Sequence, residues 1–164
     1  MALVVEDGTG LANADSYTSV ADADTYIAAY KSDVTAWDAA TDAAKEAAAR
    51  QATQHLDFSY RWKGERETST QSLDWPRVYA YDERGLAYDG VPDALKQAES
   101  ELMYSIINGV SISTTITRKD QVKRKKIDVI ETEYVDGATY QTVFPIVNGI
   151  LSALYIPSGS VIRG

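Results

Sequence analysis

Apolar residues recur at three- and four-residue spacing in three stretches of the chain, and this spacing predicts three main helices. The clearest stretch covers residues 92–108, where an apolar stripe follows Pro92, a residue suited to a first helical turn. Asn108 and Gly109 then favour a helix end, because both tolerate the left-handed backbone conformation that closes helices. We expect this helix to form the centre of the fold.

Two further helices are expected before it, over residues 20–30 and 42–60. Ser19 and Asp22 have the spacing of a capping box at the start of the first helix. The second follows Thr41 and is rich in alanine, the strongest helix former. The positions predicted to face inward are Ala23, Tyr26, Ile27, Tyr30, Ala48, Ala52, Leu56 and either Ser59 or Tyr60.

The last third of the chain has a different pattern. Residues 111–117 are β-branched and alternating, which is typical of a strand or an extended linker. The alternation continues from Gln121 and suggests a hairpin that turns at Asp136 and Gly137. A short apolar helix is expected to open at Phe144 and to dock on a neighbouring molecule or on the core.

Together these patterns predict a mainly α fold, a small helical bundle with an extended, β-containing C-terminal arm and a short terminal helix. The expected division is an α-helical core over residues 1–110 and an arm over residues 111–164. A chain of 164 residues that is 45% hydrophobic can build one such core. No apolar run approaches the roughly 18 residues of a membrane span, so no membrane association is expected.

The chemistry-bearing residues do not form a catalytic pattern. The chain has no cysteine, and its single histidine, His55, has no second histidine to share a metal or a proton-transfer role. Gly8, Thr9 and Gly10 lack the rest of a phosphate-loop motif and are interpreted as a turn. The carboxylates are interpreted as solvated charges on helix faces. We therefore expect no enzyme activity, no cofactor and no metal.

A long, turn-rich connection over residues 61–84 carries a Trp-Pro pair and several tyrosines. Connections of this length usually bind something or form a lid. The aromatic side chains suit either an interface or a cover over the helical core, and both alternatives stay open. The candidate interface residues here and in the terminal helix are Trp75, Pro76, Tyr79, Tyr81, Ile146, Ile150, Leu151 and Leu154.

Charge is distributed unevenly along the chain, whose net charge is −8. Residues 1–117 hold 9 basic and 19 acidic residues, whereas residues 118–164 hold 7 and 5. Six of the seven basic residues in the second part lie within residues 118–126, and we call this segment the basic run. The basic run could bind DNA phosphates, dock on an acidic protein surface, or simply keep a strand edge solvated. Docking on a partner is slightly favoured, because no aromatic residues interleave the run. The candidate contact residues are Arg118, Lys119, Lys123, Arg124, Lys125 and Lys126.

Four segments carry a resemblance to a known family: VEDGTGLANADSYTSVADADTYIAAY, KEAAARQATQHLDFSYRWKG, SLDWPR and VPDALKQAESELMYSI. Their order resembles the small head–tail connector (adaptor) proteins of tailed phages, also described as DnaT-like single-stranded-DNA-binding proteins. The similarity covers roughly the first 110 residues well, and its most specific parts are EDGTGLANADSY and LDWPR.

The resemblance implies a structural virion protein of the phage neck, present in the host cytoplasm during assembly. Identical subunits would form a ring of about twelve copies beneath the portal protein. The ring would link the portal to the next neck or tail protein, with DNA passing through its channel without sequence specificity. The alternative implied by the second description is a single-stranded-DNA-binding protein.

Overall fold

The protein is described by a computed structural model, which covers residues 2–112, 124–127, 130–133 and 144–157. The chain forms two compact units, one of residues 1–112 with 144–164 and one of residues 113–143. The predicted mainly helical fold is confirmed. The helices of the described part are α1 (Val20–Tyr30), α2 (Thr35–Ala39), α3 (Asp42–Ser59), α4 (Asp93–Ile107) and α5 (Pro145–Leu151).

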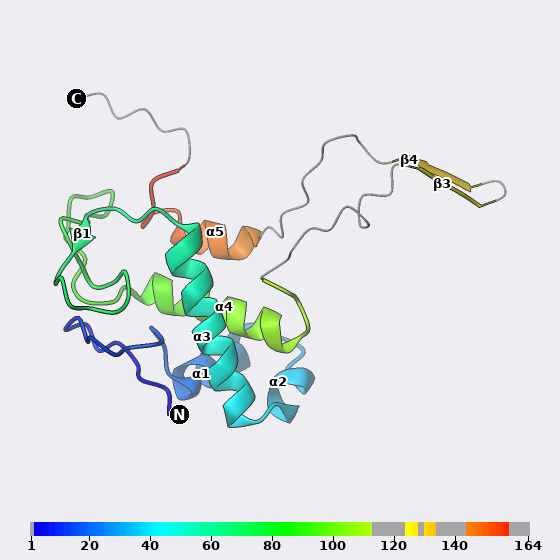
Figure 1. Cartoon of the computed structure of the whole chain (residues 1–164), viewed down its shortest axis with the longest axis horizontal. Coiled ribbons are helices and arrows are strands. Elements are labelled where there is room, and N and C mark those ends of the chain that lie inside the picture. The colour runs from blue at the N-terminus through cyan, green and yellow to red at the C-terminus, as the bar shows by residue number, and fades with distance from the viewer. Residues whose placement is uncertain (1, 113–123, 128–129, 134–143, 158–164) are drawn as a thin grey trace. The chain divides into compact units, whose positions relative to one another are not determined.

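Helix α4 is the centre of the first unit, because each of the other four helices packs against it (Figure 1). Its apolar stripe enters the core as the spacing predicts. The chain approaches through Pro92, which has an extended conformation and lies just before the helix. The fully buried apolar residues of α4 are Leu95, Ala98, Leu102 and Met103.

Helices α1 and α3 begin at the predicted caps. The Ser19 hydroxyl accepts a hydrogen bond from the Asp22 amide at 3.0 Å, and Thr41 accepts one from the Ala44 amide at 3.3 Å. The inward position predicted for Tyr30 is wrong, since 69% of this residue is exposed. Because α1 ends at Tyr30, the Tyr30 ring packs on the Tyr26 ring at the surface instead.

Trp37 anchors the short helix α2. It lies buried in α2, and its indole nitrogen donates to the Asp24 carboxylate at 2.7 Å. The Lys45 ammonium bonds the same carboxylate at 2.8 Å and lies 4.6 Å from the centre of the Trp37 ring. The α2 segment is therefore attached to both α1 and α3.

The long connection between α3 and α4 contains a small antiparallel pair, β1 (Glu65–Arg66) and β2 (Arg77–Val78). Trp75 is fully buried, and its ring meets Trp62 and Tyr88 edge-on at about 6 Å. Pro76 is buried beside it. The structure therefore corrects their placement at an interface, because these two residues fill the core of the chain itself.

Helix α5 packs on α4, so the terminal helix docks on the core of its own chain. Leu151 and Leu154, both candidate interface residues, are buried, and Ile150 is half-buried. Ile146 remains exposed. The Leu154 carbonyl accepts the Lys63 amide at 3.0 Å, which ties the segment after α5 to the connection after α3.

The second unit contains an antiparallel hairpin of β3 (Arg124–Ile127) and β4 (Ile130–Glu133). Its register places Arg124 opposite Glu133 and Lys126 opposite Glu131. The register also pairs Ile127 with Ile130. The predicted turn at Asp136 and Gly137 lies outside the described residues.

The N-terminal turn at Gly8 to Gly10 is confirmed, and it binds an anion that the chain itself supplies. The Glu6 carboxylate is buried and accepts the amides of Gly8, Gly10 and Leu11 at 2.8–3.0 Å. Both glycines have positive φ, which is why the backbone can curl around this carboxylate. The amides that a phosphate would need are already occupied.

Glu99 contradicts the expectation that the carboxylates are solvated. It lies fully buried in α4 and joins three segments. Its oxygens lie 2.6 Å from the Ser16 hydroxyl, 2.9 Å from the Thr53 hydroxyl and 3.0 Å from the Tyr17 amide. The N-terminal segment, α3 and α4 therefore meet at one carboxyl group.

Two observations indicate that this carboxyl group is protonated near neutral pH. Burial raises the pKa of Glu99 to about 8, against hydrogen bonds from Ser16, Thr53 and the backbone that lower it. The Ser16 hydroxyl also lies 2.7 Å from the Thr18 carbonyl, and its single proton cannot serve both oxygens. If Glu99 is protonated, its carboxyl group donates to the Ser16 oxygen, while the Ser16 hydroxyl donates to the Thr18 carbonyl, so that both contacts are hydrogen bonds.

We predict that stability falls as Glu99 ionises. The raised pKa means that the folded state binds this proton more tightly than the unfolded state, so stability is lost as pH rises toward 8. In urea unfolding, the wild type should lose roughly 1–2 kcal/mol between pH 7 and pH 9. Glu99→Gln should abolish this loss. Parallel pH profiles for the two proteins would contradict the assignment.

Candidate functional site

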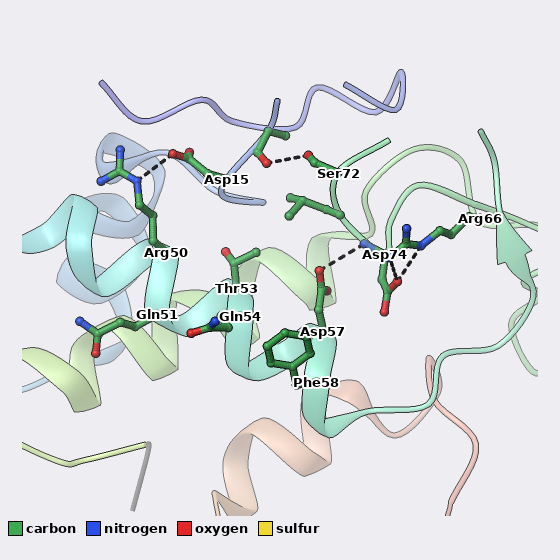
Figure 2. Close-up of a pocket in the computed structure, with 12 residues that line it drawn as sticks. Asp15, Arg50, Gln51, Thr53, Gln54, Asp57, Phe58, Arg66, Ser72 and Asp74 are labelled. Carbon is green, nitrogen blue, oxygen red and sulfur yellow. Dashed lines mark hydrogen bonds and ion pairs between the residues drawn. The ribbon is translucent and has the colours of Figure 1, made fainter. Parts of the chain in front are cut away.

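An open groove of about 610 Å³ is the best candidate for a binding site in the described part of the chain. Figure 2 shows it between α3 on one side and the N-terminal segment and the connection after β1 on the other. Its lining is mixed, with apolar groups and charged groups. The lining residues are Ala14, Asp15, Arg50, Gln51, Thr53, Gln54, Asp57, Phe58, Arg66, Ser72, Leu73 and Asp74.

The α3 wall presents an aromatic ring and two amides. Gln51, Gln54 and Phe58 are spaced by three and four residues, which places them on one face of the helix. Phe58 is 81% exposed, more than any other exposed large hydrophobic residue of the described part. No hydrogen bond within the described residues engages either glutamine amide. This face is therefore open to a ligand.

Ion pairs fix the charged groups around the groove. Arg50 Nε donates to the Asp15 carboxylate at 2.7 Å, and Arg66 donates through two nitrogens to Asp74 Oδ1 at 2.6 and 2.8 Å. With Asp57, the lining holds three carboxyl groups and two guanidinium groups. An incoming phosphate would have to compete with the carboxylates that already bind these arginines.

Tyr17 and Asp57 align the connection that forms the opposite wall. The Tyr17 hydroxyl donates to Asp57 Oδ1 at 2.5 Å and accepts the amides of Asp74 and Trp75 at 3.0 and 3.2 Å. Burial raises the pKa of Asp57 to about 6 and also raises the pKa of Tyr17. These contacts hold the far wall at a fixed distance from α3.

The groove brings together groups that can bind a ligand. His55 lies half-buried, with its ring edge-on to Phe144, and burial lowers its pKa. The described residues contain no group of three or more side chains that could hold a metal ion. Among their helices, none is long and apolar enough to cross a membrane.

The predicted site residues are distributed over both units. Tyr79 and Tyr81 are exposed at 69% and 47% in the first unit. Arg124, Lys125 and Lys126 form most of β3 in the second unit. Arg118, Lys119 and Lys123 lie outside the described residues. The basic run and the exposed tyrosines therefore stay predictions as sites.

The groove was not predicted from the sequence, because its two walls come from distant parts of the chain. Phe58 carried one usable signal, since it is an aromatic residue outside the alanine and leucine stripe of α3. The buried face of α3 is formed by the predicted stripe of Ala48, Ala52 and Leu56, and Phe58 does not belong to this stripe. A large apolar residue off that face is exposed unless another segment covers it.

Comparison with known proteins identifies the family. The chain belongs to the family described as "Putative DnaT-like ssDNA binding protein", which matches residues 1–163. No curated protein and no solved structure matches the chain. The second of the two descriptions given by the resemblance is thus supported, and no finding supports the head–tail connector family.

We predict that Tyr17→Phe destabilises the protein by about 1–3 kcal/mol, because the buried Trp75 amide loses its acceptor. Tyr81→Phe is the control, since this half-exposed tyrosine should change stability by less than about 0.5 kcal/mol. Urea unfolding at pH 7 measures both. Equal stability of the two variants would show that the Tyr17 hydroxyl does not hold the groove wall.

Proposed function

We propose that this member of the DnaT-like family binds single-stranded DNA, with the basic run Arg118–Lys126 contacting the phosphates. One observation carries the proposal: six of the sixteen basic residues fall within nine consecutive positions, in a different unit from the acidic helical core. The family description supports DNA as the ligand.

The concentration of charge is pronounced. Residues 113–143 hold six basic and five acidic residues, whereas the rest of the chain holds ten and nineteen. All six of these basic residues fall within residues 118–126. DNA should therefore be repelled by the core and attracted by this run, through the release of counterions from phosphates.

A second candidate function is that of a head–tail connector, which the exposed apolar residues favour. Tyr79, Tyr81 and Leu86 are all exposed in one connection, and Leu86 is 64% exposed. Isolated exposed apolar residues are ordinary, but several in one segment suit an interface. In this proposal about twelve copies form a ring in the virion neck, between the portal and the next tail protein.

The first prediction concerns the basic run. Substituting Lys119, Lys123 and Lys125 by glutamine should weaken binding of a fluorescent 20-nucleotide strand and flatten its salt dependence. For single strands the logarithmic slope changes by roughly 0.7 for each phosphate that the protein no longer neutralises. Fluorescence anisotropy between 50 and 200 mM salt measures this change.

The matched control removes three basic residues from the core, Arg61, Arg84 and Lys96, by the same substitution to glutamine. It changes the net charge equally but leaves the run intact. If both triple variants lose the same affinity, binding depends on net charge alone and the assignment to the run is wrong. If the wild type binds no strand at all, the DNA-binding function itself is wrong.

The connector function makes a separate prediction. Mixed with the portal protein, the chain should assemble in a fixed stoichiometry near twelve copies, measured by mass photometry. Tyr79→Asp with Tyr81→Asp should abolish assembly, because a charge is buried in the interface. Tyr30→Asp is the control, since Tyr30 is as exposed as Tyr79. No association between wild type and portal would exclude this function.

A further inference from the structure

We infer that the groove between α3 and the connection after β1 binds an unpaired nucleobase, which stacks on Phe58. This inference rests on the proposed DNA-binding function and adds a second contact on the helical core. It assigns the base to the groove and leaves the phosphates to the basic run.

Phe58 supplies the stacking surface. Phe58 is 81% exposed. It borders the groove at the end of α3, as Figure 2 shows. Every nucleobase has a flat π face, so the ring alone accepts any base, and a preference among bases must come from the polar groups of the lining. The groove, at about 610 Å³, exceeds the space that one base needs.

The charges of the lining favour a base over a phosphate. Three carboxyl groups outnumber two guanidinium groups, and both arginines are held in ion pairs. A phosphate would meet net repulsion there, whereas a neutral base would not. The site is therefore complementary to the part of DNA that the basic run does not bind.

The polar groups suit the edge of a base that bears an amino group. The amides of Gln51 and Gln54 are unengaged and can both donate and accept. Carboxylates such as Asp74 accept hydrogen bonds, and the amino groups of cytosine and adenine donate them. Thymine has no amino group. Cytosine and adenine strands should therefore bind more tightly than thymine strands.

The geometry also selects single strands. In a duplex both faces of each base are covered by neighbours, so none can stack on Phe58 without being extruded. An unpaired base has no such cost. Preference for single strands over duplex therefore follows from the ring, whereas phosphate contacts at the basic run would be compatible with either.

Phe58→Ala tests the inference, with Phe58→Tyr retaining the ring and Leu86→Ala removing a comparably exposed apolar side chain outside the groove. Loss of one stacked base should weaken binding of a 20-nucleotide cytosine strand about five- to a hundredfold. Phe58→Tyr and Leu86→Ala should bind like the wild type. Since Phe58 is exposed, thermal unfolding should show that all variants remain folded.

The outcomes separate the two proposals. If the wild type binds cytosine strands and Phe58→Ala binds equally well, the groove inference is wrong and the DNA-binding function stands. The same conclusion follows if thymine strands bind more tightly than cytosine strands. If Phe58→Ala instead changes the sedimentation of the free protein, the groove receives a second copy of the chain and the base-stacking inference is wrong. If the wild type binds no strand, both proposals fail.

Discussion

The fold depends on the buried carboxyl group of Glu99. It is the point at which the N-terminal segment, α3 and α4 are connected by hydrogen bonds, in a place that water does not reach. A buried carboxyl group without partners would cost several kcal/mol, so its three contacts must form together. This requirement fixes the position of the N-terminal segment relative to both helices.

The groove is a consequence of that arrangement. Tyr17 follows Ser16, and both residues contact Glu99, so the Tyr17 ring is directed toward Asp57 on α3. The Tyr17 hydroxyl then accepts hydrogen bonds from the Asp74 and Trp75 amides, and these bonds position the connection that forms the opposite wall of the groove. The buried carboxyl group and the open groove are thus two ends of one hydrogen-bonded network. The exposed ring of Phe58 lies little more than one turn of α3 beyond Thr53, which bonds Glu99.

Local patterns predicted the helices, because helix starts, stops and apolar stripes depend on residues close in sequence. Ser19, Thr41 and the stripe of α4 are examples. Burial of Glu99 could not be predicted in this way, because it needs Ser16 and Thr53 from distant segments. The groove was missed for the same reason. The pairing of β3 with β4 was not predicted either, since alternation alone does not fix which residues stand opposite one another.

The two proposals assign different parts of a single strand to different parts of the chain. The basic run lies in the unit of residues 113–143, and the ring of Phe58 lies in the helical unit. The division follows from charge, because the helical unit carries the acidic excess that repels phosphates. In this account an acidic protein binds DNA without a basic surface on its core.

The most direct test of this claim is to crosslink the full-length protein to a cytosine strand by ultraviolet light and to identify the crosslinked peptides by mass spectrometry. Crosslinks are expected in two places, the peptides around residues 118–133 and the peptide that contains Phe58. Crosslinks confined to the connection with Tyr79 and Tyr81, or none at all, would contradict the claim.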